Sequence, residues 1–284
     1  MSLWSDYAGS EVRMVTCGGV RTRIVVTPPH DDSGGTPVLV LHGRGGHLES
    51  FHRNVPALSA RRTVISVDLL GHGLTEHAGT RYDVGEIAGH LDQVMAQLDD
   101  GRGFDVVAQS LGAWAVLHLL ATRPPAIRRL VLIEPAGLQT HAERMSDVRV
   151  RTAATAGGRA FDDPSIDNVR LRFAQLLHDP TVVEEELIDL RRRLYALPGA
   201  GAVHLAVRSA DNAAYVVEPA CLAVAGRSIL FLHGEHGHLP APLLTDIAGR
   251  LPAARAVTIP AAKQWPHYER PELVNAHLLQ YLER

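Results

Sequence analysis

The fold is decided by the stretch VVAQSLGA, residues 106–113. An apolar strand leads into Ser110, with the small residues Ala108 and Gly112 two positions away on either side, and a helical pattern begins at Leu111. A sharp turn from strand to helix exposes one hydroxyl at the edge of a sheet, and the following helix N-terminus points amide donors at it. Two interpretations are open at this point: Ser110 is a nucleophile, or it caps the helix.

A glycine-rich loop follows an earlier apolar run in LVLHGRGG, residues 39–46. Such a loop can turn a free backbone amide towards a developing oxyanion. A phosphate-binding P-loop would need a lysine followed by serine or threonine, which this segment lacks. A third segment, VDLLGHG at residues 67–73, closes the next strand.

Short apolar runs alternate with longer amphipathic segments along the chain, which is typical of βα units around a mostly parallel sheet. Near-continuous apolar runs are expected of strands that are covered on both faces. The predicted strands are Arg13–Val15 and Arg23–Val26, which form an opening hairpin, and then Pro37–Leu41, Thr63–Val67, Phe104–Val107, Leu130–Ile133, Ile229–Leu232 and Ala256–Ile259. The predicted helices are Glu49–Ala60, Val84–Leu98, Leu111–Ala121, Leu243–Arg250 and Pro271–Tyr281.

The interval 137–211 breaks this alternation, because it is charged, rich in arginine and helical in pattern. We predict that it forms a helical cap over the carboxyl edge of the sheet, where ligands bind in open α/β architectures. Residues 1–136 and 212–284 would then form the core. The arginine run at 191–193 is expected to be a solvated helix face, or a cationic rim that docks an acidic carrier.

Taken together, these segments resemble the α/β-hydrolase superfamily, in its branch of esterases, C–C hydrolases and acyltransferase-like proteins with a helical cap. The resemblance extends from the opening hairpin to PHYERP at residues 266–271. It implies the α/β-hydrolase fold, with an eight-stranded, mostly parallel sheet. It also implies that Ser110 is the nucleophile and that the backbone amides of Leu111 and Arg44 form the oxyanion hole. The family elbow reads G-x-S-x-G, and here its first glycine is Ala108.

The positions of the acid and the base depart from the family pattern. After the seventh strand the family carries an aspartate where this chain has Gly237, and after the eighth strand it carries a histidine where this chain has Gln264. Glutamine cannot take a proton at neutral pH, and a serine without a base is a poor nucleophile. Either the base has been displaced or the reaction is a different one.

His204, in an apolar stretch late in the predicted cap, is our candidate for a displaced base, although a buried structural histidine fits the same pattern. His236 and His238 lie on the loop that normally carries the acid and are the other candidates. Glu134 is the candidate acid, because it follows the sixth strand directly. A purely structural role for Glu134 is the alternative.

Three side chains are predicted to line the substrate site: His42, Gln109 and Gln264. The guanidinium of Arg44 lies next to the oxyanion loop and can clamp a carboxylate or phosphate of the substrate in a bidentate manner. An arginine that faces solvent is the alternative interpretation.

Charge and composition point to small-molecule chemistry. The net charge of −3 and the absence of a long basic run leave no footprint for nucleic acid or an anionic membrane. The two cysteines lie far apart in the sequence and predict neither a disulfide nor a metal site. No apolar run reaches the ~18 residues of a membrane span. We therefore expect a cytoplasmic protein with no cofactor and no metal, acting on a small-molecule or carrier-bound acyl substrate.

Three functions are compatible with these residues. The first is hydrolysis or transfer of an ester or thioester acyl group through Ser110, with a displaced general base. The second is a non-hydrolytic lyase or cyclase, and the third is a ligand-binding pseudoenzyme. We predict the first, because a nucleophile and two oxyanion elements have little purpose without an acyl-type intermediate.

Overall fold

An eight-stranded sheet forms the centre of the protein in a computed structural model, which describes residues 2–31, 34–123, 126–148, 150–151, 158–224 and 228–283. The strand order is β1-β2-β4-β3-β5-β6-β7-β8. The pairs β1–β2 and β2–β4 are antiparallel, and every other neighbouring pair is parallel. The strands are β1 (Glu11–Cys17), β2 (Val20–Thr27), β3 (Val38–Leu41), β4 (Val64–Val67), β5 (Phe104–Gln109), β6 (Ile127–Ile133), β7 (Ser228–Gly234) and β8 (Ala254–Ile259). The mostly parallel sheet predicted from the sequence is confirmed.

The hairpin that opens the sheet is also confirmed. Cys17 pairs with Val20 across a two-residue turn. Both turn residues, Gly18 and Gly19, have positive φ angles, of 56° and 85°. A tight hairpin turn of this kind needs positive φ at both central positions, which glycine adopts without strain.

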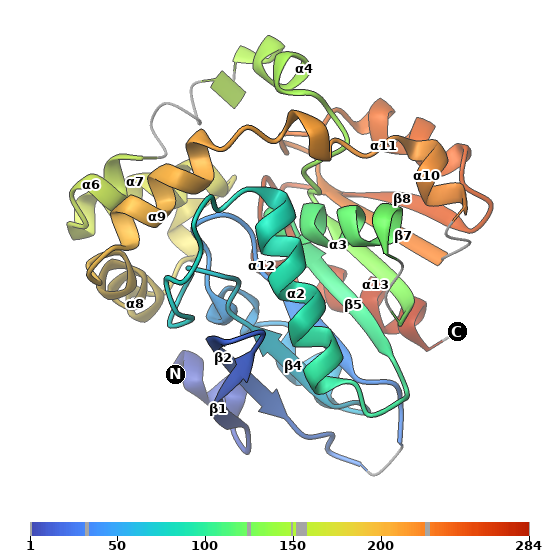
Figure 1. Cartoon of the computed structure of the whole chain (residues 1–284), viewed down its shortest axis with the longest axis horizontal. Coiled ribbons are helices and arrows are strands. Elements are labelled where there is room, and N and C mark those ends of the chain that lie inside the picture. The colour runs from blue at the N-terminus through green and yellow to red at the C-terminus, as the bar shows by residue number, and fades with distance from the viewer. Residues whose placement is uncertain are drawn as a thin grey trace.

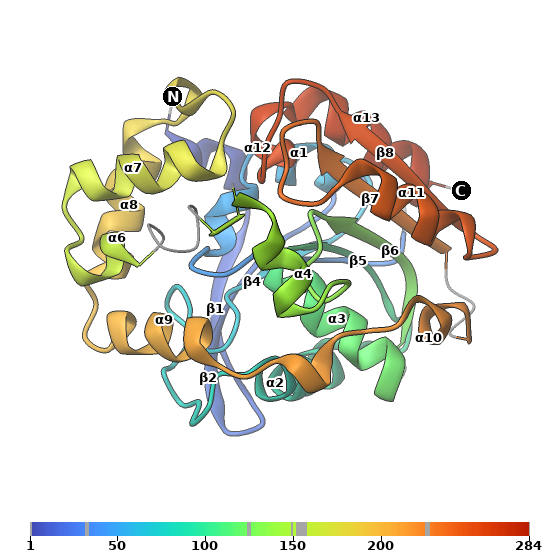
Figure 2. The same cartoon turned by 90° about the horizontal axis from the view of Figure 1, so that it is seen from above.

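Helices cover both faces of the sheet (Figures 1 and 2). Successive strand residues point to opposite faces. On one face Leu39 and Leu41 pack with α2 (Val84–Leu98) and α3 (Leu111–Thr122). On the other face Val38 and Val40 pack with α1 (Val55–Ser59) and α13 (Pro271–Leu282). Both faces of the sheet are therefore shielded from solvent, as the continuous apolar runs predict. The helices outside the interval between β6 and β7 are η1 (Leu3–Tyr7), η2 (Leu48–Phe51), α1 (Val55–Ser59), α2 (Val84–Leu98), α3 (Leu111–Thr122), α11 (Ala241–Gly249), α12 (Pro266–Glu269) and α13 (Pro271–Leu282).

The single helix predicted over Glu49–Ala60 is wrong. The structure forms the short 3₁₀ helix η2 and then a separate α1 that begins at Val55. Pro56 explains the break, because proline lacks an N–H and is tolerated in the first turn of a helix but not in its interior.

A group of helices lies between β6 and β7, and the described residues of this interval contain no strand. In Figure 2 the helices α6 to α9 lie to one side of the sheet, and α4 crosses above α3. Phe173 and Leu187 form an apolar cluster with Trp265, which follows β8. These elements are α4 (His141–Ser146), α6 (Arg159–Asp162), α7 (Ile166–Leu176), η3 (Pro180–Val182), α8 (Glu185–Tyr195), α9 (Ala200–Ser209), η4 (Ala213–Tyr215) and α10 (Pro219–Val224). The predicted boundaries between core and cap stay a prediction.

The arginine run on α8 divides into two kinds of side chain. Arg191 is buried, with its guanidinium 4.6 Å from the ring centroids of both Phe173 and Trp265. Arg192 and Arg193 instead pair with Asp189 on the helix surface. The prediction of a solvated face is therefore wrong for Arg191, because this residue lies on the buried, apolar side of the amphipathic helix α8.

No described helix has both the length and the apolar character needed to span a bilayer. The cytoplasmic location stays a prediction.

Candidate active site

Ser110 lies in the turn between β5 and α3 with backbone angles of φ 49° and ψ −105°. Residues other than glycine rarely adopt such angles, and strain of this kind persists where the surrounding structure enforces it. The Ser110 N–H donates to the carbonyl of Ile133, and its own carbonyl accepts from the N–H groups of Trp114 and Ala136. No side-chain hydrogen bond from Ser110 caps the helix. The capping interpretation of this serine is therefore wrong.

The glycine after the elbow allows α3 to start close to the end of β3. A Cβ atom at Gly112 would lie 2.7 Å from the carbonyl oxygen of His42 and 2.9 Å from the Cβ of Leu41. The Gly112 N–H donates to that same carbonyl of His42. This contact fixes the elbow next to the glycine-rich loop.

The two predicted oxyanion donors are the backbone N–H groups of Arg44 and Leu111. In the described part of the chain neither amide has a hydrogen-bond partner. Leu111 opens α3, so its N–H is one of the four that a helix leaves unpaired at its start. A Cβ at Gly43 would lie 2.0 Å from the side-chain oxygen of Gln109 and 3.0 Å from the Cβ of Ser110, so only glycine lets these groups approach. The oxyanion roles stay predictions.

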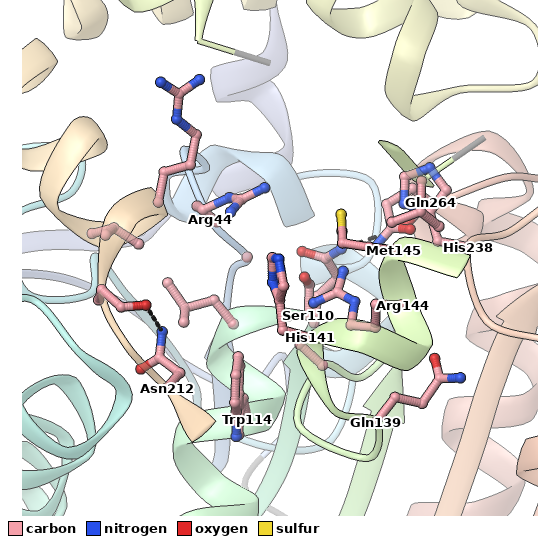
Figure 3. A pocket seen from close by; sticks show the side chains of 18 of the residues that line it. Arg44, Ser110, Trp114, Gln139, His141, Arg144, Met145, Asn212, His238 and Gln264 are labelled. Atoms are coloured by element: carbon pink, nitrogen blue, oxygen red, sulfur yellow. Dashed lines mark hydrogen bonds between the residues drawn. The ribbon is translucent and has the colours of Figure 1, made fainter. Parts of the chain in front are cut away.

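Ser110 opens into a cavity of about 300 Å³ between the sheet edge and the helices above it. Figure 3 shows part of the wall, with Ser110 between Trp114 and Asn212 on one side and Gln264 and His238 on the other. The predicted site residues that line this cavity are Arg44, Gln109, Ser110, Leu111 and Gln264.

His42, Glu134 and His204 do not line it in the described structure. His42 is buried behind the oxyanion loop, where its Nδ1 bonds the carbonyl of Gly43 and its Nε2 accepts from the N–H of Leu69. His42 therefore supports the glycine-rich loop from behind, and the prediction that it lines the substrate site is wrong.

Glu134 occupies the space in which the family acid would stand. One carboxyl oxygen of Glu134 accepts from the N–H of Gly234 at 2.9 Å, and the other accepts from the N–H of His238 at 3.2 Å. A Cβ atom at Gly237 would lie only 1.8 Å from the first of these oxygens. The Glu134 carboxyl therefore leaves no room for a side chain at position 237, which explains why that position is a glycine.

Burial raises the pKa of Glu134 to about 8, against the opposing effect of the N–H groups of Gly234, His238 and Leu239. The Glu134 backbone has a φ of 45°, which marks a second strained residue beneath the cavity. Glu134 stays the candidate acid.

We expect the raised pKa of Glu134 to be visible in the stability of the protein. The folded-state pKa lies above the ordinary value of 4.5, so the protonated carboxyl stabilises the fold. This stabilisation is complete below pH 4.5 and is lost as the pH rises through about 8. The side chain of the Glu134→Gln variant does not titrate. From pH 5 to pH 8 the free energy of unfolding of the wild type should therefore fall by at least about 1 kcal/mol relative to that of this variant. Urea unfolding at both pH values measures the difference. Parallel profiles for the two proteins would show that Glu134 does not titrate in this range.

Gln264 replaces the family base, and its environment is unusual for an amide. Its backbone N–H donates to the carbonyl of Leu176, and its own carbonyl accepts from Nε2 of Gln109 at 3.3 Å. Its side-chain oxygen is buried and has no hydrogen-bond partner among the described residues. Because Gln264 lines the cavity, a ligand there could donate a hydrogen bond to this oxygen.

His204, the predicted displaced base, lies in a second and much smaller cavity of about 20 Å³. Its ring stacks on Phe161 with centroids 3.6 Å apart. Burial, with a contribution from Arg44 and Arg172, lowers the pKa of His204 to about 2. The structure does not bring His204 together with Ser110, and an imidazole with so low a pKa is a poor acceptor at neutral pH.

Two other histidines do line the Ser110 cavity: His238 and His141. His236 instead stacks on His178, with ring centroids 4.2 Å apart. It is not among the described residues that line the cavity. His141 lies on α4, and Figure 3 shows its ring projecting into the cavity towards Ser110. Among the described residues, no group of three or more histidine, cysteine or acidic side chains is arranged to hold a metal.

Sequence reasoning missed His141. The only signal for its helix is the capping box in which Thr140 and Glu143 exchange hydrogen bonds. That motif predicts where α4 begins, but not that the helix turns its first residue towards a sheet edge. Sequence reasoning also missed Arg144, Arg172 and Arg208, which line the same cavity.

A family model described as the alpha/beta hydrolase fold matches residues 36–271. The chain belongs to this family. The match spans the glycine-rich loop, the Ser110 elbow, Glu134 and Gln264.

Two curated relatives of this alpha/beta hydrolase come from Pseudomonas putida. The dihydrolipoyllysine-residue acetyltransferase component of the acetoin cleaving system is 27% identical over 88% of the chain. The 2-hydroxy-6-oxo-2,4-heptadienoate hydrolase of strain F1 is 30% identical over 66% of the chain. The chain spans only 64% and 63% of the length of these two relatives.

Solved structures resemble the alpha/beta hydrolase over nearly its whole length. The 2-hydroxy-6-oxo-6-phenylhexa-2,4-dienoate hydrolase from Rhodococcus sp. strain RHA1 has a TM-score of 0.78 and 19% identity, covering 96% of this chain and 100% of that one. A serine hydrolase from Cycloclasticus zankles has a TM-score of 0.81 and 18% identity, covering 97% and 98%. At these identities the likeness shows the fold alone.

Proposed function

We propose that this alpha/beta hydrolase acts on an ester or thioester acyl group through Ser110, and either hydrolyses it or transfers it to an acceptor. The observation that carries the proposal is the strained backbone of Ser110 on the wall of a cavity, with no capping hydrogen bond to explain it. The unpartnered amides of Arg44 and Leu111 support the same chemistry, because they supply donors for an oxyanion. The relatives named as a hydrolase and as an acetyltransferase component fit both outcomes.

The proposed general base is His141 rather than His204. The Ser110 Oγ attacks the carbonyl carbon while its proton passes to the imidazole, and the two amides stabilise the oxyanion. When the intermediate collapses, the alcohol or thiol leaves with that proton, and the acyl group stays on Ser110. Water or an acceptor hydroxyl then attacks the acyl-serine, with the same imidazole taking its proton. Collapse of this second intermediate breaks the bond to Ser110, the imidazole returns the proton to Oγ, and the acid or the acylated acceptor is released. His141 is favoured over His204, which lies in another cavity and has a strongly lowered pKa. It is favoured over His238, which also lines the Ser110 cavity, because Figure 3 shows the His141 ring projecting towards Ser110.

A fluorophosphonate probe should label Ser110 once per folded chain, as located by mass spectrometry. His141→Gln should slow this labelling by at least about 100-fold, because a positioned general base contributes a factor of that order. His238→Gln lines the same cavity and serves as the matched control, with an expected change of less than about 3-fold. If His141→Gln labels at the wild-type rate while His238→Gln is slow, the base is His238. If the folded wild type does not label at all, the covalent mechanism fails.

A further inference from the structure

Four arginines line the wall of the Ser110 cavity. They come from four separate segments: the loop after β3 and the helices α4, α7 and α9. The one carboxylate among the described lining residues is Asp211, which is exposed and accepts from the N–H of Ala213. The four arginines of this cluster are Arg44, Arg144, Arg172 and Arg208.

No acidic partner neutralises the cluster in the described part of the chain. None of its members forms an ion pair there, although most arginines elsewhere on the molecule do. Arg172 is only 7% exposed, and its Nε has no hydrogen-bond partner among the described residues. Glu134 lies close enough to Arg144 to act on it electrostatically, but burial raises the pKa of Glu134 to about 8, so it is mainly neutral at pH 7.

The members of the cluster also act on one another. Burial, followed by the charges of Arg172, Arg144 and Arg208, lowers the pKa of Arg44 to about 9. Buried cations without a counter-ion destabilise a fold, since they lose water and repel each other. Arg172 is buried, Arg44 and Arg144 are half-buried and Arg208 is exposed. Four arginines on one cavity wall, one of them buried, are explained more simply by a ligand that supplies the missing negative charge.

We infer that the cavity binds a substrate carrying a compact dianion, either a phosphate monoester or a pair of carboxylates, beside the acyl group that Ser110 attacks. The inference rests on the proposed function and names the substrate class of the same site. Guanidinium groups match the planar geometry of carboxylate and phosphate oxygens and bind them through paired hydrogen bonds. Two or more arginines can therefore share one dianion, whereas a single negative charge would leave most of the cluster uncompensated.

The test measures binding of inorganic phosphate, succinate, acetate and the neutral dimethyl succinate to the full chain by calorimetry and thermal unfolding. We expect phosphate or succinate to bind at least about 10-fold more tightly than acetate, to raise the melting temperature, and to weaken as salt concentration rises. Whichever of the two binds more tightly identifies the dianion as phosphate or dicarboxylate. The same dianion should slow fluorophosphonate labelling of Ser110, because the two sites share one cavity.

Matched variants on and beside the cluster separate binding from folding. Arg172→Gln and Arg208→Gln should each weaken dianion binding by about 10- to 100-fold, since each removes charge-assisted hydrogen bonds. Arg172→Gln should also raise the melting temperature of the ligand-free protein, because it removes an uncompensated buried charge. Arg170→Gln is the control: it lies on the same helix, is exposed and pairs with Glu185, so dianion binding should stay within about 2-fold.

Equal binding of the neutral diester, or no binding of any anion, would overturn the inference. So would loss of binding in Arg170→Gln to the same degree as in Arg172→Gln. If Ser110 is labelled but no dianion binds, the substrate class is wrong and the proposed function stands. If a dianion binds and Ser110 is never labelled, the proposed function fails and the anion site stands.

Discussion

Gln264→His is expected to give the protein an esterase activity on p-nitrophenyl acetate at least about 100-fold above that of the wild type. The substitution returns an imidazole to the position at which the α/β-hydrolase family carries its base. Our candidate acid, the Glu134 carboxyl, already lies where a side chain at position 237 would project. General-base catalysis typically contributes 10²- to 10⁴-fold, and the lower end of that range allows for imperfect alignment.

The local structure favours this substitution. The backbone of residue 264 is held from both sides, through the carbonyl of Leu176 and the side chain of Gln109. The glutamine side chain makes no compensating interaction through its oxygen among the described residues, so its removal leaves no new unpaired group. An imidazole nitrogen facing Glu134 would gain a hydrogen bond to a carboxyl group that burial keeps largely protonated at pH 7. A positive imidazole beside it should favour the ionised carboxylate.

The double variant Gln264→His with Glu134→Gln tests that partnership. It should lose about 10-fold or more of the activity gained, since the new imidazole would lack its orienting acid. Gln264→Asn is the matched control at the same position and should gain nothing. A folded Gln264→His protein with wild-type esterase activity would mean that Glu134 only supports the β7 loop.

The sequence predicted the fold well because its signals are local. Apolar strands, the hairpin glycines and the small residues around Ser110 each determine their own backbone, and the sheet assembles from them. The break near Pro56 was missed because the helical pattern continues through it. For Ser110 and Glu134, the predicted positions at strand ends were enough to bring them to one edge of the sheet.

The cavity wall could not be predicted in the same way. His204 lies on the buried face of α9, as its apolar surroundings indicate, but Phe161 holds it in another cavity. His141 and Arg172 line the Ser110 cavity only because of how α4 and α7 pack relative to the sheet, which no sequence periodicity records. The contact between Glu134 and Gly237 likewise joins residues about a hundred positions apart. It becomes visible only in the structure, where a Cβ at position 237 would clash with a carboxyl oxygen of Glu134.

Ser110→Ala is expected to abolish fluorophosphonate labelling and to lower the esterase kcat/KM of the Gln264→His protein by at least about 10³-fold. Dianion binding should stay within about 2-fold of the parent, because the hydroxyl is not part of the arginine cluster. This combination separates the acyl mechanism from the two other functions compatible with the sequence. A lyase or cyclase that uses Ser110 only to orient its substrate would keep substantial turnover in this variant, and a pseudoenzyme would show no turnover to lose.

A second substitution at the same position shows what the serine costs the fold. At φ 49° alanine is as strained as serine, so Ser110→Ala should leave the free energy of unfolding nearly unchanged. Ser110→Gly adopts this angle freely and should raise the free energy of unfolding by about 1 kcal/mol, although it is equally inactive. Urea unfolding of the three proteins measures both differences. A protein that becomes more stable when its serine is lost retains that serine for its chemistry, whereas a Ser110→Gly variant less stable than the wild type would show that the serine supports the turn.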